Sequence, residues 1–498
     1  MADEQEPVRR LHTVDRAQSL LRPVVVEELI AEDHPARAIW EFVGQLDLSP
    51  YVEQVRSLEG AAGRPAFEPR LLISLWVYSY SRGVSSAREI ERLCGHDPAY
   101  QWLTGMESIS AHTLSDFRVR HREALEELFV QVLGLLSAEG LITLERVMQD
   151  GTRVRASAAP SGFRTRARIK GCLKQARQLV AELRALADEE LTLRMRRARK
   201  RAAHERQERL TAALKQFDEL KAAKSRVERV STTDPEARIM KQADGGSAPS
   251  YNVQLTTDAA HGLVVGVDVV QSGSDYRQLT PAVDRLEQQV GSAPAQVVVD
   301  GGYISSRNIV AMADRGIELI GPGPTDRAAD ANRTNAYRHH GVQPEYQVDK
   351  FRYEAATDTF VCPQGKQLRY DAKYEISGAM RYRYKASQAE CDACPAKQFC
   401  CPRSRRGRSI ERVEPLPAIA AFRARMQSDE ARAIYRTRSQ VAEFPNLWLK
   451  EKLRLRQFRV RRLAKVRMEA LWAVLTYNIQ QWIRLRWRPQ WLASQAPA

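Results

Sequence analysis

The sequence predicts an α/β fold, in which a mixed sheet carries two aspartates, two insertions interrupt the sheet, and helical segments lie at both ends. Three observations favour this fold. Short strand-like runs lead into Asp-Gly at residues 147–151 and 297–301, strand patterns fill residues 250–271, and helical spacing dominates residues 1–140 and 431–488. At 498 residues, of which 43% are hydrophobic, the chain is long enough for several cores.

The charge balance indicates a polyanionic partner. Lys and Arg total 77 against 61 Asp and Glu, which gives a formal net charge of +16. An excess on this scale is typical of proteins that bind nucleic acid, with an anionic membrane as the second candidate. The first residues lack the apolar core of a signal peptide, and no stretch is long and uncharged enough to span a bilayer. We therefore expect a soluble, cytoplasmic protein.

Residues 1–140 are predicted to form an N-terminal helical domain. Pro69 stands where the first turn of a helix tolerates proline, and apolar residues follow it at helical spacing. Thr113 and Asp116 are expected to open a further helix that runs towards Gly140.

Residues 141–160 are predicted to hold the first strands of the sheet, as a strand–turn–strand unit with Asp150 at the end of its first strand. Residues 161–230 form a basic helical block, with 20 Lys or Arg against 9 acidic residues. A heptad seam begins at Ile169, breaks in the stretch RMRRARKRAAHERQER and resumes near Leu210, which favours a helical hairpin over one long rod. Such a block is usually a solvated coiled-coil face, and we expect its basic stretch also to contact DNA backbone.

Residues 231–325 are predicted to continue the sheet. Two strand runs joined by AAHG indicate a hairpin, and a helix over Leu279–Val290 precedes the strand that ends on Asp300. A second helix and the short strand IELIGPG follow. Residues 326–430 are polar and weakly periodic, which indicates an insertion, and residues 431–498 return to helix, with a strong basic excess.

Two aspartates at strand ends suggest a metal site. An Asp before Gly is most often a turn residue, so neither Asp150 nor Asp300 alone indicates a metal site, and only the two together do. Two such carboxylates and a third from a helix can hold two Mg²⁺ ions, which activate a nucleophile for phosphoryl transfer. Glu443 is the candidate for the third carboxylate, with Glu451 as the alternative, and Lys450 lies seven residues after Glu443.

Taken together, these features resemble those of a bacterial insertion-sequence transposase of the Asp-Asp-Glu (DDE) type, in the subgroup with an N-terminal helical transposase domain. The resemblance covers most of residues 20–480. The motifs that carry it are VMQDGTRVRASAA, TTDPEARIMKQADGGSAPSYNVQLTTD, VVVDGGYISSRNI, the Tyr435–Lys450 segment and the stretch from RPAFEPRLL to YQWLTG. Tyr251, Asn252, Gln254 and Asp275 also recur in such families, without a role beyond shaping the site.

The resemblance implies a ribonuclease-H-like catalytic core that cleaves double-stranded DNA at terminal inverted repeats and joins the ends to target DNA. It implies two Mg²⁺ (or Mn²⁺) ions and a homodimer or higher homo-oligomer acting on paired ends, near the bacterial nucleoid. The residues that would serve as metal ligands are Asp150, Asp300 and Glu443.

The resemblance also implies phosphate contacts from Tyr435, Arg438 and Lys450. In the commonest family signature, the Tyr and the Arg lie one residue nearer the Glu, at the positions held here by Arg436 and Ser439. For the basic block, the expected backbone contacts are Arg196, Arg197, Arg199 and Lys200.

Five of the seven cysteines fall between Cys362 and Cys401, and clustering of this kind suggests metal more than disulfides in a reducing compartment. The expected zinc ligands are Cys362, Cys391, Cys394 and either Cys400 or Cys401. Such a site would stabilise a segment poor in apolar core. Free or redox-active thiols are the alternative interpretation.

Two functions from different classes fit these observations. The first is an active transposase, and the second is a catalytically silent, transposase-derived DNA-binding regulator. A structure-selective nuclease on the same fold would explain the carboxylates equally well, but not the helical N-terminal domain or the basic block. The presence of all three carboxylates favours the first.

Overall fold

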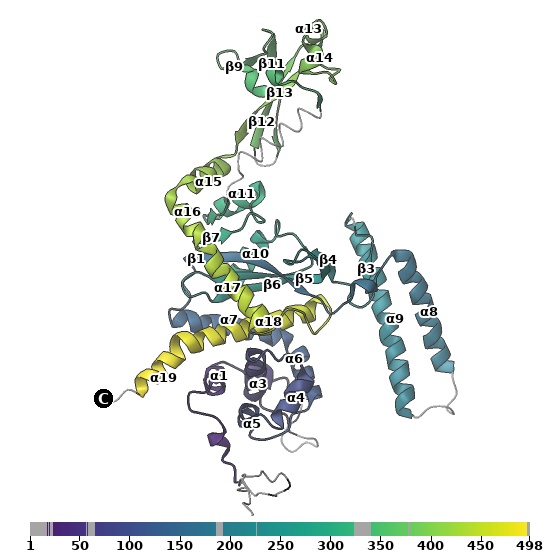
Figure 1. The fold of residues 1–498 in the computed structure, drawn as a ribbon, viewed down its shortest axis with the longest axis vertical. Coiled ribbons are helices and arrows are strands. Elements are labelled where there is room, and N and C mark those ends of the chain that lie inside the picture. The colour runs from purple at the N-terminus through teal and green to yellow at the C-terminus, as the bar shows by residue number, and fades with distance from the viewer. Residues whose placement is uncertain are drawn as a thin grey trace, which may run out of the picture.

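The computed structural model describes residues 17, 19, 23–55, 57, 65–185, 193–225, 227–322, 340–376 and 379–495. Its main body is a sheet covered by helices from both ends of the chain (Figure 1). Among the described residues, no helix combines the length and apolar character needed to cross a membrane.

The N-terminal part is helical, as predicted. Its elements are η1 (Val26–Leu29), α1 (Pro35–Val43), α2 (Ser49–Val52), α3 (Pro69–Ser81), α4 (Ala87–Cys94), α5 (Pro98–Thr104), α6 (Ala111–Arg120) and α7 (Arg122–Ala138). The helix expected to open at Thr113 begins earlier, because Ser110 is its N-cap and accepts the Thr113 N–H. It also ends sooner, at Arg120, and α7 starts after His121.

The central sheet is mixed. Its strands are β1 (Arg146–Arg155), β4 (Arg238–Lys241), β5 (Ser247–Asp258), β6 (Val264–Val270), β7 (Gln296–Val299) and β8 (Glu318–Ile320). β5 pairs antiparallel with β1, β6 and β4, whereas β7 pairs parallel with β1 and with β8. The order across the sheet is therefore β6-β5-β1-β7-β8, with β4 beside another part of β5. The predicted hairpin is confirmed as β5 and β6, and the predicted helix as α10 (Leu279–Val290); α11 (Ser306–Asp314) follows β7.

The predicted strand–turn–strand unit around Asp150 is wrong. β1 runs unbroken through Asp150 and Gly151, because both residues have partners on β5, at Leu255 and Gln254. The parallel partner β7 ends earlier and pairs with β1 only as far as Gln149. Asp150 therefore lies inside a strand, yet at the level where its neighbouring strand stops.

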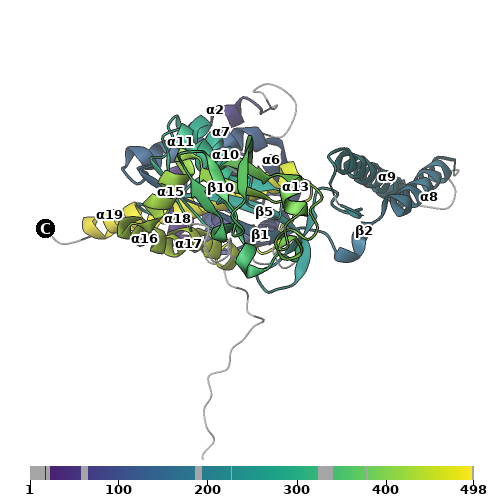
Figure 2. The same cartoon turned by 90° about the horizontal axis from the view of Figure 1, so that it is seen from above.

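The basic block forms the predicted hairpin, which projects from the body in Figures 1 and 2. It consists of α8 (Arg166–Ala185) and α9 (Leu193–Ala222), and the two-stranded pair β2 (Phe163–Arg164) and β3 (Val230–Ser231) closes its base after η2 (Pro160–Gly162). The predicted seam is buried between the helices and forms a separate small core with Ile169 and Leu210 among its members. In the sequence the spacing of the seam continues from Ile169 to Ala187, and Ala187 lies outside the described residues.

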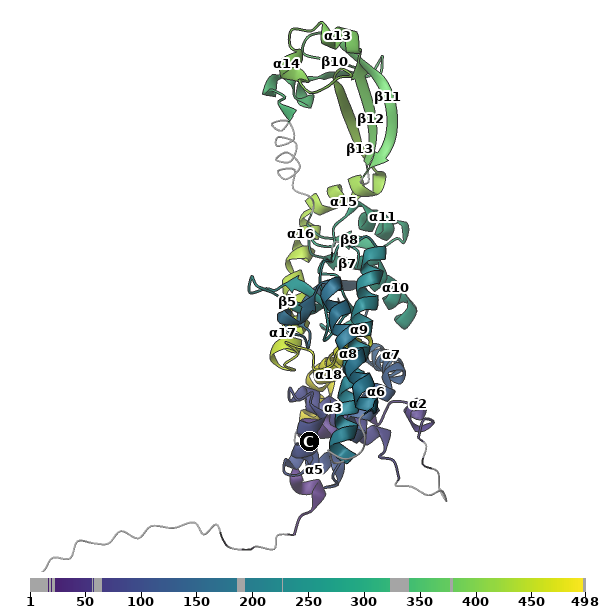
Figure 3. The same cartoon turned by 90° about the vertical axis from the view of Figure 1, so that its right-hand side faces the viewer.

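Residues 340–376 and 379–415, here called the Cys module, form a five-stranded antiparallel sheet at the far end from the N-terminal helices (Figure 3). Its elements are η3 (Pro344–Tyr346), η4 (Val348–Lys350), β9 (Arg352–Glu354), β10 (Thr359–Val361), β11 (Gln367–Ile376), β12 (Ala379–Ala386), α13 (Gln388–Asp392), α14 (Lys397–Cys400) and β13 (Ser409–Pro415). The strand pattern is weak in the sequence because few apolar side chains alternate with the Tyr, Arg and Lys residues of β11 and β12.

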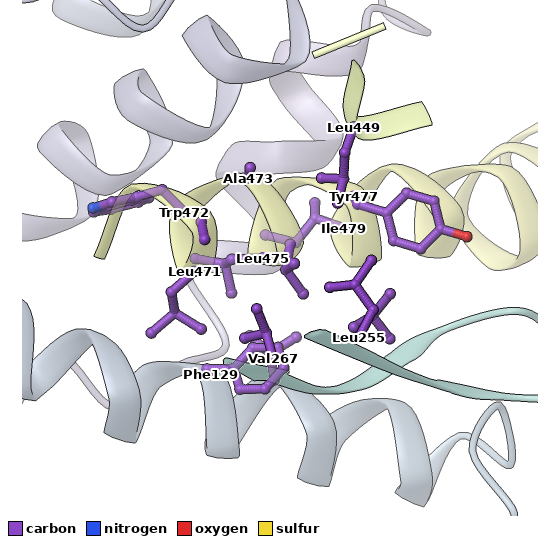
Figure 4. Packing of buried hydrophobic residues seen from close by; sticks show 14 of the residues in the cluster. Phe129, Leu255, Val267, Leu449, Leu471, Trp472, Ala473, Leu475, Tyr477 and Ile479 are labelled. Atoms are coloured by element: carbon purple, nitrogen blue, oxygen red, sulfur yellow. The ribbon is translucent and has the colours of Figure 1, made fainter. Parts of the chain in front are cut away.

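The C-terminal part is helical. It contains α15 (Pro417–Gln427), α16 (Asp429–Arg436), α17 (Arg438–Glu451), α18 (Leu463–Trp482), the π-helical turn η5 (Ile483–Trp487) and α19 (Arg488–Ser494). α18 is buried along most of its length and contacts both the N-terminal helices and the sheet. Figure 4 shows its apolar residues facing Phe129 of α7 and Leu255 and Val267 of the sheet. The main core is therefore continuous from the N-terminal helices to the sheet.

Candidate active site

The aspartate pair, Asp150 and Asp300, lies on neighbouring strands. Asp150 is in β1, and Asp300 directly follows Val299, the last residue of the parallel strand β7. Because β1 and β7 pair as far as Gln149 and Val299, the two aspartates occupy equivalent positions one residue beyond this ladder. The Gly302 N–H donates to Asp300 Oδ1 at 2.8 Å and holds the turn after β7.

Arg438 links the aspartate pair. It is the first residue of α17, and its Nη2 lies 3.1 Å from Asp150 Oδ1 and 3.9 Å from Asp300 Oδ2. The side chains of Arg438 and Asp150 are only 13% and 14% exposed, against 40% for Asp300. The pair is therefore open to solvent on the Asp300 side and closed on the α17 side.

Burial raises the pKa of Asp150 from its usual 3.8 to about 6. The carboxylates of Asp300 and Asp275 add to the rise, whereas the Arg438 charge and the Gly151 N–H oppose it. A nearby cation stabilises the ionised form of such a buried carboxyl group. Arg438 provides one positive charge, which is shared by the two carboxylates.

Asn446 is a site residue that the sequence analysis missed. Its Nδ2 donates to Asp150 Oδ2 at 2.9 Å, so both oxygens of Asp150 are engaged from α17. The signal was available in the spacing, since Asn446 lies eight residues after Arg438 and four before Lys450, on one side of a helix. It was missed because an amide carries no charge and Pro445 obscures the helix, although α17 continues through that proline.

The predicted phosphate-contact residues differ in placement. Lys450 is half-buried near the site, where burial lowers its pKa, the charge of Asp150 opposes this change and that of Arg153 adds to it. Tyr435 belongs to α16, and its ring packs against an apolar cluster that includes Met148 and Val298 beneath the pair. The structure thus brings Arg438 and Lys450 to Asp150, while Tyr435 packs under the strands.

Glu443 lies on α17 but is exposed, three residues before Asn446. No hydrogen bond or ion pair joins it to the aspartate pair among the described residues, and within the same residues no three His, Cys, Asp or Glu side chains are arranged to hold a metal ion. The alternative, Glu451, pairs instead with Arg456 at 2.5 Å. Glu443, the expected third carboxylate, therefore lies on the same helix as Arg438 and Asn446, which contact Asp150, but makes no contact of its own with the pair among the described residues.

A buried polar network supports the strands behind the pair. Asp275, in the loop after β6, accepts hydrogen bonds from Asn252 Nδ2 and Gln254 Nε2, each at 2.7 Å. Gln254 Oε1 in turn accepts from Gln149 Nε2 at 3.0 Å and from the Tyr303 hydroxyl at 2.5 Å.

Two glycines let this network approach the pair. A Cβ at Gly151 would lie 2.4 Å from Gln254 Nε2 and 2.6 Å from Asp275 Oδ1. A Cβ at Gly302 would lie 3.0 Å from Asp300 Oδ1 and 3.8 Å from Asp275 Oδ2, so both carboxylates border the same point. Asp275, which was expected only to shape the site, is thus a third carboxylate beside the pair.

The basic residues predicted for DNA backbone contact lie in the first two turns of α9, far along the chain from the pair. Arg197 and Arg199 are exposed and Lys200 is half-buried, while the side chain of Arg196 lies outside the described part of the chain.

The predicted zinc ligands all border one cavity in the Cys module, together with Cys401. The seven cysteines are free thiols. Cys401 is buried, and the other four of the cluster are half-buried.

Two families match parts of the sequence. Residues 24–120 match the family described as "Transposase domain (DUF772)", and residues 361–483 match "Transposase DDE domain". The first match covers the helices from η1 to α6, and the second runs from the end of β10 into the C-terminal helices, so it includes Glu443 but not the aspartate pair. No curated protein matches the chain.

Proposed function

Because the two family matches identify the chain as an insertion-sequence transposase of the DDE type, we propose that it cleaves double-stranded DNA at the terminal inverted repeats of its element and transfers the freed ends to target DNA. The observation that carries this proposal is the aspartate pair, held on adjacent parallel strands and linked by Arg438 at 3.1 and 3.9 Å. The general class, a transposase, follows from the family matches alone, and the chemistry is the proposed part.

The strand arrangement supports a ribonuclease-H-like core. Three antiparallel strands, β6, β5 and β1, are followed across the sheet by two strands parallel to β1. A ribonuclease-H-like sheet has this strand order and these strand directions. If the short strand β4 is left out, β1 with Asp150 is the first strand along the chain, and β7, which Asp300 directly follows, is the fourth. Ligands of open α/β sheets bind at such carboxyl ends of parallel strands.

The donor set fits hard divalent cations. Asp150 and Asp300 offer carboxylate oxygens, which Mg²⁺ and Mn²⁺ prefer, and their mutual repulsion is only partly offset by Arg438. Asp150 and Asp300 would hold the ions, with Glu443 proposed as the third ligand from α17. When bound, two such ions supply an activated water or 3′-hydroxyl and stabilise the charge of an in-line displacement at phosphorus.

The protein side chains position this chemistry. Asn446 orients Asp150 through Oδ2, and Arg438 holds the pair together from the closed side. Lys450, half-buried beside them, is placed to contact a DNA phosphate, because its charge is poorly solvated and gains from an anionic partner. The exposed cations at the start of α9 would bind the DNA backbone farther away.

We further propose that the protein acts as a homodimer or higher oligomer on paired ends, since two element ends must be joined to one target. We also propose that Tyr435 contacts a DNA phosphate. Because its ring is packed under the strands, the hydroxyl would be the contacting group.

A cleavage assay tests the proposal. Labelled duplex carrying the inverted repeats that flank the gene is incubated with Mg²⁺ and with wild type, Asp300→Ala or Asp314→Ala. Asp314 is the matched control, because it is exposed and ends α11, the helix that follows Asp300. Wild type and Asp314→Ala should cut at the repeat ends, whereas Asp300→Ala should bind the same duplex without cutting it.

Two other outcomes would contradict the proposal. Equal cutting by Asp300→Ala would remove the aspartate pair from the chemistry. Tight binding without cutting by wild type, in both Mg²⁺ and Mn²⁺ and across salt concentrations, would favour the catalytically silent regulator.

A further inference from the structure

We propose that Cys362, Cys391, Cys394 and Cys401 form a structural zinc site in the Cys module, distinct from the aspartate pair. The five cysteines of this module come from separate segments. Cys362 directly follows β10, Cys391 lies in α13 and Cys394 just after it, and Cys400 and Cys401 end α14. All five line a single cavity.

Two backbone amides point at these sulfurs. The Lys366 N–H donates to Cys362 Sγ at 3.3 Å, and the Arg408 N–H donates to Cys391 Sγ at 3.4 Å. Each donor follows a glycine with left-handed φ, Gly365 at +74° and Gly407 at +83°. Only glycine adopts this conformation readily, so both turns are built to aim an N–H group at a sulfur. Such bonds stabilise thiolates, the form of cysteine that binds zinc.

Gly407 is further required by close packing. A Cβ there would lie 2.9 Å from the Ala386 carbonyl oxygen and 3.5 Å from Cys391 Sγ. The turn thus brings the chain after α14 directly against Cys391. This close approach has no role in the proposed DNA chemistry and favours a site centred on the sulfurs.

The fourth ligand is assigned to Cys401 rather than Cys400. Cys401 is buried, at 5% exposed, and lines the cavity with Cys362, Cys391 and Cys394. Cys400 also lines the cavity but is only half-buried. The more buried of the two neighbouring thiols is therefore the one assigned to the site.

Positive charge around the cavity suits a site of four thiolates, whose complex with Zn²⁺ carries a net negative charge. Arg408 and Lys397 both line the cavity together with the cysteines. Arg408 is fixed in place, since its guanidinium donates to the carbonyl oxygens of Cys400 and Tyr346, each at 3.1 Å.

The module also needs such a centre for stability. Its buried core contains six residues, Phe351, Phe360, Leu368, Tyr384, Ala386 and Ile410. A core of this size rarely sustains a fold, and natural modules of similar size add metals or disulfides. In the described residues the cysteines surround the cavity without forming a coordination shell, so ligation must draw the side chains together. Zinc should therefore raise the melting temperature of the protein.

Zinc analysis of the full-length chain tests the site. The protein is purified under reducing conditions, supplied with Zn²⁺, desalted and analysed for metal content. Wild type should retain about one Zn²⁺ per chain. Cys391→Ser and Cys401→Ser should lose most of it, whereas Cys400→Ser and the control Cys172→Ser, in α8, should retain it.

Cobalt binding keeps the test valid if a serine variant fails to fold. When Co²⁺ is added, wild type and Cys400→Ser should both show the absorption of tetrahedral thiolate coordination, with equal intensity. Wild type that binds neither Zn²⁺ nor Co²⁺ under reducing conditions would overturn the site. Zinc loss in Cys400→Ser but not in Cys401→Ser would overturn the choice of the fourth ligand.

Discussion

At the level of single residues, Asp150 combines burial with a carboxylate that the proposed chemistry needs ionised. Its pKa of about 6 in the folded protein exceeds the usual 3.8, so the folded state binds the proton more tightly than the unfolded chain does. This difference stabilises the protein below pH 3.8, and the stabilisation is lost as the pH rises through 6.

We therefore expect Asp150→Asn to gain stability relative to wild type, by on the order of 1–3 kcal/mol, when the pH is raised from 4 to 7.5. The new amide also brings a donor against Arg438 or Asn446, but this cost is the same at both pH values and cancels in the difference. Asn is nearly isosteric with Asp and removes the ionisation that is unfavourable in this buried position. Urea unfolding at both pH values, without divalent metal, measures the difference. Asp314→Asn serves as the control, and the same gain at pH 4 and pH 7.5 would contradict the argument.

Asp275 is expected to act as a positioning residue through its charge. The carboxylate raises the pKa of Asp150, and it also accepts hydrogen bonds from Asn252 and Gln254. Asp275→Asn removes the charge, so the pKa of Asp150 should fall and the acidic limb of the cleavage pH profile should move to lower pH. Both of these hydrogen bonds go to Oδ1, which the amide keeps. Its Nδ2 then replaces Oδ2 and faces the guanidinium of Arg153, which lies 3.4 Å from Oδ2, and this donor clash should lower kcat by about tenfold or more.

A purely structural role would leave the position of the acidic limb unchanged, and Asp314→Asn should leave both rate and profile unchanged. A rate loss without a pH shift would therefore remove Asp275 from the electrostatics of the site.

At this scale, the sequence identified the charged residues better than the neutral ones. Asp150 and Asp300 could be singled out because each follows a strand-like run and carries a carboxylate that suits phosphoryl transfer. Arg438 and Lys450 were named through the family resemblance, as phosphate contacts, and the contact of Arg438 with the aspartates was not foreseen. Asn446 has a fitting spacing on α17, but this spacing acquires a meaning only once Asp150 is known to lie across the helix–strand contact. The placement of Glu443 is likewise a tertiary property and stays a prediction.

At the level of elements, β1 shows why strand ends are hard to predict. Asp-Gly is a strong turn signal, but long-range pairing with β5 overrides it. The termination that matters functionally is that of β7, because it leaves Asp150 without a parallel neighbour. Similarly, the start of α6 is set by the Ser110 cap, which competed in the sequence with Thr113 as an equally acceptable capping residue.

Gly151→Ala tests whether β1 and the polar network must touch. The added Cβ has no room beside Gln254 Nε2 and Asp275 Oδ1, so the network or the strand must shift. We expect a destabilisation of about 1–3 kcal/mol and a loss of cleavage. Thermal unfolding and the cleavage assay measure the two effects.

Gly134→Ala is the matched substitution. Gly134 lies exposed in α7 with no atom within 4 Å of the added Cβ, so alanine should raise stability by about 0.5–1 kcal/mol. Equal effects of the two substitutions would show that Gly151 is not under steric restraint.

At the scale of the whole molecule, the described residues form four hydrophobic clusters, which show which parts of the chain depend on one another for stability. The smaller of the two in the body joins β1, β7 and β8 to α16 and α17. The main core unites the N-terminal helices, the central sheet and α18. Trp472 of α18 is its central contact, stacked against Tyr80 of α3 at a centroid distance of 6.4 Å. The hairpin and the Cys module each have a small core of their own. Helical spacing predicted the helices, but not that residues far apart in the sequence share one core.

Two deletions should therefore behave in opposite ways. Replacing residues 166–226 with a short Gly-Ser linker removes the hairpin but leaves the main core untouched, and the ends lie close together because β2 pairs with β3. This variant should stay folded. It should also bind duplex DNA about tenfold or more weakly, with a shallower dependence on salt, since its basic side chains would no longer displace counterions.

Removing residues 1–140, in contrast, strips the covering helices from α18 and exposes Trp472 together with the apolar face shown in Figure 4. We expect this variant to aggregate or to lose near-ultraviolet circular dichroism, because so large an apolar surface cannot remain in water. Size-exclusion chromatography and circular dichroism of both variants compare them directly. A folded, monodisperse protein without residues 1–140 would mean that the N-terminal helices are an independent unit, and their role would then be limited to contacts with DNA or with a second copy of the chain.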